Sequence, residues 1–154
     1  MNHEEYMRQA LRYASQAYAL DEVPIGAVVV NPQGAVIGSG FNRREIAKDP
    51  TAHAEILAIR DASQHYGDWR LYGCAIYVTV EPCLMCAGAI ALSRIETVYY
   101  GASSPKSGAL GSLCNLYDVQ GFNHYPSVTA GVLGEECAMI LADFFRGKRS
   151  SSSV

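Results

Sequence analysis

Apolar residues recur along the chain with two different periods, and these periods predict helices alternating with strands. In residues 5–19 the apolar positions form one stripe, which is typical of an amphipathic helix: Met7, Ala10, Leu11, Ala14, Ala17 and Tyr18. Two runs rich in valine and isoleucine follow, at residues 25–30 and 35–40, with Pro32 and Gly34 between them. This pattern predicts two strands joined by a tight turn.

The second half of the pattern continues the alternation. We expect a helix over residues 52–65, begun by Asp49, Pro50 and Thr51. Strands at 74–80 and 97–101 flank a helix at 83–92 that is rich in alanine. Residues 102–126 predict a long loop with a short helix near 112–117, followed by a strand at 127–133 and a last helix at 135–146. Such alternation predicts an α/β fold with a partly parallel sheet covered by helices.

Composition narrows the class of protein. The 154 residues fit one domain, which we place at 1–149. We expect a disordered tail at 150–154, which contains four serines in a row. The net charge of -3 argues against a nucleic-acid binder whose whole surface is basic. No apolar run is long enough for a membrane span, and the first residues lack the apolar core of a signal peptide. With five cysteines, an odd number, we expect a reduced, cytoplasmic protein.

Two short segments carry the candidate chemistry. Cys83 and Cys86 stand three residues apart at a predicted helix start, so both sulfurs can reach one metal ion, and His53 could supply a third ligand. Three protein ligands leave zinc one open position for water, as in catalytic sites. Glu55, two residues after His53, is placed to act as the base. Taken alone, the cysteine pair could equally be a redox pair or two small core residues.

The conjunction of His-x-Glu with Pro-Cys-x-x-Cys matches the signature of zinc nucleobase deaminases. The chain resembles the bacterial tRNA-specific adenosine deaminases, which make inosine at the wobble position. The resemblance rests on segments that run in order over most of the chain: residues 21–28, 49–56, 81–89, 106–108, 111–113, 122–124 and 143–146. The zinc motif marks the wider deaminase superfamily, and the later segments favour the tRNA branch.

This resemblance implies a cytidine-deaminase-like fold, a three-layer α/β/α arrangement around a five-stranded mixed sheet. It implies a cytoplasmic homodimer with one Zn²⁺ per chain, which binds the anticodon loop of tRNA and no membrane. His53, Cys83 and Cys86 would hold the zinc, and Glu55 would carry protons. The substrate would be contacted by Val23, Asn42, the backbone of Ala54, Lys106, Asn123, Phe145 and Arg149. Asn42 could instead be only a turn former after the second strand.

The chain also departs from this family. Ser104 stands where the family often has an acidic residue near the ribose, and Tyr125 stands where an arginine is common. The basic C-terminal extension is short. A deaminase of a free base or nucleoside, of the guanine or cytosine type, is therefore the alternative. A non-catalytic zinc scaffold is a third interpretation, although a scaffold would have no need of Glu55.

For the tRNA hypothesis we expect a local basic rim despite the acidic net charge. Its candidates lie after the second strand, in the long loop and at the end of the last helix: Arg43, Arg44, Lys106, Arg146 and Arg149. Phosphate contacts of this kind make binding depend on salt. We also expect Cys74, Cys114 and Cys137 to be small core residues, and one of Phe144 and Phe145 to be exposed.

Overall fold

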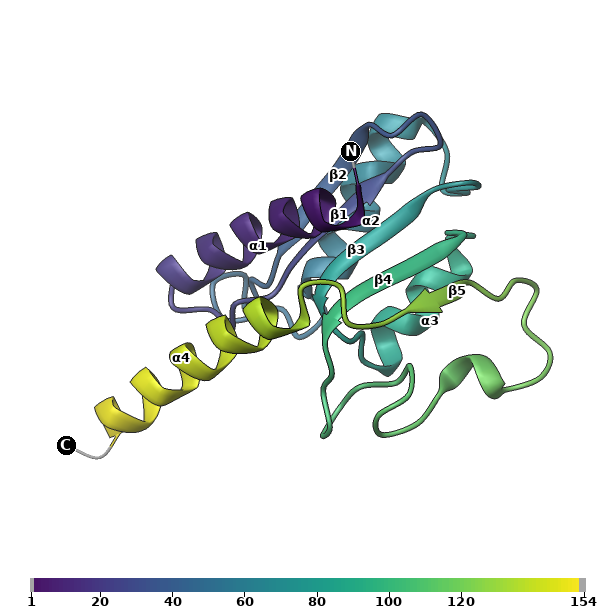
Figure 1. The fold of residues 1–154 in the computed structure, drawn as a ribbon. Coiled ribbons are helices and arrows are strands. Elements are labelled where there is room, and N and C mark those ends of the chain that lie inside the picture. The colour runs from purple at the N-terminus through teal and green to yellow at the C-terminus, as the bar shows by residue number, and fades with distance from the viewer. Residues whose placement is uncertain (1, 153–154) are drawn as a thin grey trace.

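The computed structural model describes residues 2–152, and for residues 149–152 it describes the backbone alone. Helices and strands alternate along the chain (Figure 1). Their order is α1 (His3–Ala19), β1 (Gly26–Val30), β2 (Val36–Phe41), α2 (Ala54–Tyr66), β3 (Ala75–Val80), α3 (Leu84–Leu92), β4 (Thr97–Ala102), the short 3-10 helix η1 (Leu116–Asp118), β5 (Ser127–Thr129) and α4 (Gly134–Ser152).

The strands form one mixed sheet in the order β2-β1-β3-β4-β5. β1 pairs antiparallel with both β2 and β3, whereas β3, β4 and β5 run parallel. The parallel pair β3 and β4 is connected through α3, as parallel strands require a crossover. The prediction of a five-stranded mixed sheet is thereby confirmed.

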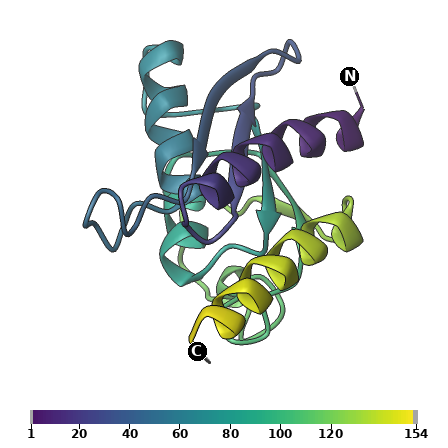
Figure 2. The same cartoon turned by 90° about the vertical axis from the view of Figure 1, so that its left-hand side faces the viewer.

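Helices cover both faces of the sheet, so the molecule has three layers, as predicted (Figure 2). Alternate side chains of β1 enter different cores: Ala27 and Val29 pack toward α2 and α3, while Val28 and Val30 pack toward α1 and α4. Because both faces of β1 are buried, its sequence is a continuous apolar run without alternation.

α2 lies unusually close to β2. Its Ala54, Ala58 and Ala62, spaced by one turn each, are fully buried against the sheet. Gly38 and Gly40 of β2 allow this approach, because a Cβ atom would lie 2.5 Å from the Ala58 carbonyl oxygen at Gly38 and 2.6 Å from the Ala54 carbonyl oxygen at Gly40. Small residues on both elements therefore fix the position of α2, whose first turn carries Glu55.

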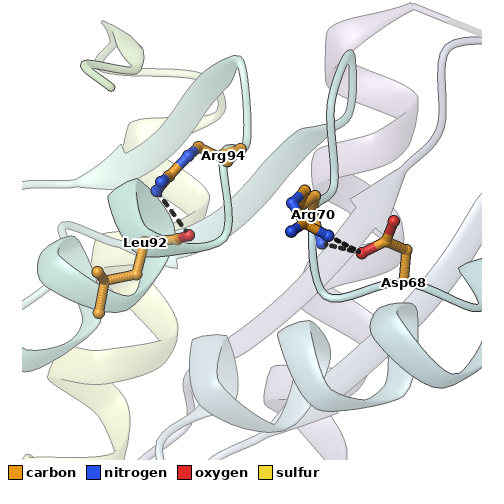
Figure 3. Close-up of polar contacts among 4 residues, drawn as sticks. All are labelled: Asp68, Arg70, Leu92 and Arg94. Atoms are coloured by element: carbon orange, nitrogen blue, oxygen red, sulfur yellow. Dashed lines mark hydrogen bonds and ion pairs between the residues drawn. The ribbon is translucent and has the colours of Figure 1, made fainter. Parts of the chain in front are cut away.

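The connections that follow α2 and α3 are held by arginine contacts (Figure 3). Arg70 pairs with Asp68 at 3.3 Å, and Arg94 donates to the carbonyl oxygen of Leu92 at 3.0 Å. Both guanidinium groups also lie over the ring of Trp69, at 4.4 and 5.5 Å from its centroid. These contacts stabilise the connections that enter β3 and β4.

Several boundaries differ from the sequence prediction: α1 begins at His3 and not at residue 5, and η1 covers Leu116–Asp118 and not 112–117. α2 begins at Ala54 and not at residue 52, because Asp49 accepts hydrogen bonds from the amide and hydroxyl of Thr51 in a separate turn. β5 ends at Thr129, because Gly131 and Leu133 take positive φ angles of 85° and 50° and turn the chain toward α4. α4 continues past residue 146 to Ser152.

Of the predicted disordered tail, residues 150–152 form helical backbone at the end of α4, and residues 153–154 lie outside the described part of the chain. Among residues 2–152, no helix is both long and apolar enough to cross a membrane. Cys74 and Cys137 are buried as expected, but Cys114 is exposed in the loop after β4, so its assignment to the core was wrong. Of the phenylalanine pair, Phe144 is buried and Phe145 is exposed.

Candidate active site

The three candidate metal ligands meet at the starts of two helices. His53 is the N-cap of α2, Cys83 is the N-cap of α3, and Cys86 lies in the first turn of α3. The His53 side chain makes no capping hydrogen bond to α2, so its ring is free to turn toward the two sulfurs of α3. His53 Nδ1 lies 3.6 Å from the sulfur of Cys83 and 3.6 Å from the sulfur of Cys86. The structure thus brings together residues that are thirty positions apart.

These side chains fit a zinc ion. With Zn–S and Zn–N bonds of ordinary length, tetrahedral ligands lie about 3.5 Å from one another, close to the observed separations. Two sulfurs and one imidazole nitrogen are also the donor set that zinc favours. Their ligand atoms all lie within 4.8 Å of one another, and no other group of this kind is found among residues 2–152. One zinc ion per chain accounts for the arrangement.

The pKa values of the two thiols are shifted in opposite directions. Hydrogen bonds from Cys86 and His53 lower the pKa of Cys83 to about 4 despite its partial burial. The hydrogen bond to Cys83 and burial raise the pKa of Cys86 well above its ordinary value. The hydrogen bond with Cys83 also raises the pKa of His53. A metal ion that binds both sulfurs therefore displaces the proton from Cys86.

Glu55 lies in the first turn of α2 and is buried, with 4% of its surface exposed. Burial disfavours its charged form and raises its pKa to about 7. A carboxyl group with such a pKa can both accept and release a proton near neutral pH. Because Glu55 lines the same cavity as His53 and Cys83, it is placed to exchange protons with a molecule bound there.

The cavity beside the cluster has a volume of about 140 Å³. Besides the metal residues and Glu55, it is lined by Val23, Ile25, Asn42, Arg44, Ala54, Val80, Glu81, Ser104 and Ser107. The buried Asn42 donates to the Val23 carbonyl oxygen at 3.4 Å and accepts from the Arg44 amide at 3.3 Å. Asn42 therefore shapes the turn after β2 and also faces the cavity, so the two interpretations of it are compatible.

The predicted RNA-contacting residues are not all at this cavity. Lys106 is exposed between Ser104 and Ser107, which line it. Phe145 lines a neighbouring groove of about 540 Å³ that shares Val23 and Arg44 with the cavity. Asn123 lines a different pocket, beside α3, which shares no residue with the cavity. The side chain of Arg149 lies outside the described part of the chain.

Two buried carboxylates near the site were missed in the sequence. Glu81 is 3% exposed and lines the cavity, while Glu22 is 1% exposed and lies next to Val23. Each stands at the border of an apolar run: Glu22, which follows Asp21, precedes β1, and Glu81 follows β3. An acidic residue in that position is a signal of a buried, hydrogen-bonded carboxylate.

Comparison with protein families adds to this geometry. The model of the cytidine and deoxycytidylate deaminase zinc-binding region matches residues 1–102. The tRNA-specific adenosine deaminase of Bacillus subtilis is 49% identical to the chain over 151 residues, which cover 98% of this chain and 93% of that protein.

Solved structures give the same picture. A structure from a study of A-to-I editing by tRNA:A34 deaminases at the wobble position of transfer RNA is 46% identical, with a TM-score of 0.85. That match covers 89% of this chain and 99% of the other. A guanine deaminase from Bacillus subtilis is 32% identical, with a TM-score of 0.64, and covers 92% of this chain and 93% of its own.

Proposed function

Because the chain belongs to the cytidine and deoxycytidylate deaminase family, we propose that it hydrolyses adenosine to inosine at the wobble position of tRNA, with a zinc ion at His53, Cys83 and Cys86. The observation that carries the proposal is the 49% identity, over almost the whole chain, to a tRNA-specific adenosine deaminase. We assign the activity to a single domain, residues 1–149, of a cytoplasmic protein, where tRNA is available.

The chain's own residues account for the chemistry. His53, Cys83 and Cys86 would hold the zinc, which would supply a Lewis acid for the activation of water. Glu55 would accept one proton from the water that attacks C6 of adenine and deliver it to N1 of the ring. It would then take the remaining hydroxyl proton and pass it to the departing amino group. Water enters, ammonia leaves and the base becomes hypoxanthine. Asn42 and the backbone of Ala54 hold the base edge in the cavity, and Val23 forms its wall.

The RNA around the target base would lie across the exposed residues near the cavity. Phe145 is 45% exposed in the groove that continues from the cavity, where its ring can stack on a neighbouring base. Lys106 and Arg149 would contact phosphate. An anticodon loop suits this site, since its bases are already unstacked and need little energy to enter a pocket.

We propose that two copies form a homodimer through α3. This helix leaves the large apolar side chains of Leu84, Met85 and Leu92 exposed. Leu113, in the long loop after β4, is exposed as well. Exposed apolar groups of this size favour a protein interface. Asn123, whose pocket is lined by Leu92 and other α3 residues, would then serve the RNA site of the assembled dimer. Light scattering measures the mass of the particles in solution for wild type and for Leu92→Asp. Wild type should be a dimer and Leu92→Asp a monomer, and a monomeric wild type would contradict the proposal.

A deaminase of free purine bases is the second candidate. Ser104 favours it, because a neutral side chain lines the cavity where the tRNA enzymes often have an acidic residue near the ribose. The 32% identity to a guanine deaminase supports the same chemistry in this fold. The higher identity to the tRNA enzyme, 49%, favours RNA.

One experiment separates the two candidates. Purified zinc-loaded protein is incubated with an adenosine-34 anticodon stem-loop, free adenosine, cytidine and guanine, and inosine or ammonia is measured. The stem-loop should react fastest. If a free base or nucleoside reacts faster than the stem-loop, the tRNA assignment is wrong and the second candidate replaces it.

A further inference from the structure

A buried carboxylate beside the cavity has no part in the chemistry described so far. α1 ends at Ala19 with Leu20 as its C-cap, and Asp21 takes a positive φ angle of 63°, which turns the next residue, Glu22, into the protein. The amide of Glu22 donates to the Ala17 carbonyl oxygen at 2.9 Å, and its side chain is 1% exposed. Burying a carboxylate this completely is costly unless both of its oxygens are hydrogen-bonded.

Both oxygens are hydrogen-bonded, and both donors belong to one loop. The backbone amide of Glu45 donates to Oε1 at 3.1 Å, and that of Ile46 donates to Oε2 at 2.6 Å. Residues 43–48 are otherwise exposed to solvent. The loop is therefore fastened to the protein interior at its middle by one side chain from a distant segment.

The two segments that Glu22 joins form one wall of the cavity. Val23 follows Glu22, and Asn42 and Arg44 precede the fastened amides; all three line the cavity. Two further bonds join the same segments: Asn42 Nδ2 donates to the Val23 carbonyl oxygen at a long 3.4 Å, and the Asn42 amide donates to the Ile25 carbonyl oxygen at 3.1 Å. Beyond Asn42, the exposed part of the loop that carries Arg44 is joined to this segment through Glu22. The opposite side of the cavity, with His53, Glu55 and Cys83, stands on helices that pack against the core through Ala54, Ala58 and Ala87.

We propose that Glu22 is a positioning residue for substrate binding: its carboxylate holds the 43–48 loop so that Asn42 and Arg44 face the base and its neighbouring nucleotides. The inference deepens the proposed function and rests on it. Because the metal residues and Glu55 stand on separate elements, loss of Glu22 weakens binding of the substrate and leaves the chemical step intact.

The test is a graded series measured with the anticodon stem-loop. Glu22→Ala removes both acceptors, and its KM should rise roughly tenfold, the effect of about two lost hydrogen bonds. Glu22→Gln keeps one acceptor oxygen, so its KM should lie between those of wild type and Glu22→Ala. In both variants kcat and the zinc content should stay near those of wild type. If Glu22→Ala does not fold, Glu22→Gln alone decides.

A double variant tests whether Glu22 acts through the loop. In an Arg44→Ala background, Glu22→Ala should raise KM by a smaller factor than in wild type, because the side chain that it positions is already absent. If Glu22→Ala raises KM by the same factor in both backgrounds, Glu22 does not act through Arg44.

The matched control is Glu4→Gln, which removes the same charge at an exposed position of α1, paired with Arg8. Its KM should remain near that of wild type. The proposal is overturned if Glu22→Ala leaves KM unchanged, if kcat falls in step with zinc content while KM stays constant, or if Glu4→Gln raises KM as much as Glu22→Gln. If wild type does not deaminate the stem-loop, the proposed function fails separately, and the same series is read with the base or nucleoside that it does accept.

Discussion

Three buried glutamates surround the cavity, and their hydrogen bonds assign them different tasks. The oxygens of Glu22 and Glu81 accept backbone amides from loops, so these side chains are committed to holding the chain. Among the described residues, no loop amide donates to Glu55, which lines the cavity and has its pKa raised to about 7 by burial. Of these three glutamates, Glu55 is thus the one placed to move a proton during a reaction.

We predict that Glu55→Gln keeps zinc but loses nearly all turnover. Glutamine has a similar shape and cannot carry a proton, so kcat should fall by roughly 10²–10⁴-fold or more, since one group acts at several steps. Zinc content and stem-loop affinity, measured by elemental analysis and fluorescence anisotropy, should match wild type. Activity within tenfold of wild type would show that another group is the base.

Glu81 should make stability depend on pH. Burial raises its pKa, but hydrogen bonds from Ser112, Ser104 and Leu110 outweigh burial and hold the pKa below its ordinary value. The folded protein therefore binds this proton less tightly than the unfolded chain. The stabilisation is complete above the ordinary glutamate pKa of about 4.3 and is lost as pH falls through the lower pKa of the folded state.

The corresponding variant is Glu81→Gln. At pH 7 its free energy of unfolding should be lower than that of wild type by about 2 kcal/mol, and the difference should narrow as pH falls below about 4. Urea denaturation is compared for the two proteins with the metal removed, so that loss of zinc at low pH does not contribute. A difference that is constant over this pH range would refute the assignment.

At the scale of elements, the apolar pattern predicts the helices and strands in order, because most of them bury one face or, like β1, both faces. β5 is the exception, since its three residues are exposed. Boundaries are predicted less well where local hydrogen bonds compete. Asp49 binds Thr51 in a turn of its own and delays α2, and the left-handed Leu133 shortens β5. Such competition depends on the conformation of a few residues and leaves no periodic signal.

The same distinction holds for the site. His53, Glu55, Cys83 and Cys86 were predictable because short motifs at helix starts carry them. Glu22 and the loop around Ile46 were not, because their contact joins segments more than twenty residues apart and involves backbone amides, which any residue type can supply. The position of Asn123 in a separate pocket was equally invisible before the strands were arranged.

The close contact between α2 and β2 predicts a severe effect for a single methyl group. Gly38→Ala would place its Cβ against the Ala58 carbonyl oxygen, and displacing a helix backbone costs about 3 kcal/mol or more. Thermal denaturation should show a clear loss of stability. The control is Gly147→Ala in α4, where a Cβ meets nothing within 4 Å and alanine favours the helix. Equal stability of Gly38→Ala and wild type would mean that α2 can move away freely.

Zinc should stabilise the pairing of α2 with α3, since its ligands cap both helices. We predict about one zinc per chain, lost in His53→Ala, and a lower melting temperature for that variant and for chelator-treated wild type. Chelation should shift the melting temperature of wild type much more than that of His53→Ala. Retention of stoichiometric zinc by His53→Ala would show that this residue is not a ligand.

At the scale of the whole molecule, a net charge of -3 has to be reconciled with an RNA substrate. Arg44 lies in the wall of the cavity and Lys148 in the adjoining groove, but Asp21, Glu22 and Glu45 line the same groove, and Lys148 pairs with Asp21. Positive charge near the cavity is therefore interspersed with acidic groups, and RNA contacts depend on individual cations. Three to five phosphate contacts by such cations would give a slope of roughly -2 to -3.5 in log affinity against log salt.

We predict that Lys106→Ala reduces this slope by about 0.7, the value of one contact to a single strand. Arg8→Ala is the control, since Arg8 lies on the exposed side of α1, paired with Glu4, and should leave the slope unchanged. Deamination of the stem-loop at limiting concentration is measured across a salt series. A stem-loop reaction insensitive to salt would exclude phosphate contacts by this rim.

The cavity and the groove outside it are lined largely by different parts of the chain, and this separation has an evolutionary consequence. Every residue that lines the cavity lies between Val23 and Ser107, whereas α4 contributes Phe144, Phe145 and Lys148 only to the groove outside it. Mutations on the groove face of α4 can therefore alter what is presented to the cavity without replacing any residue that lines it. A lineage with this architecture can acquire new substrates by drift in its C-terminal helix while every intermediate remains an active hydrolase.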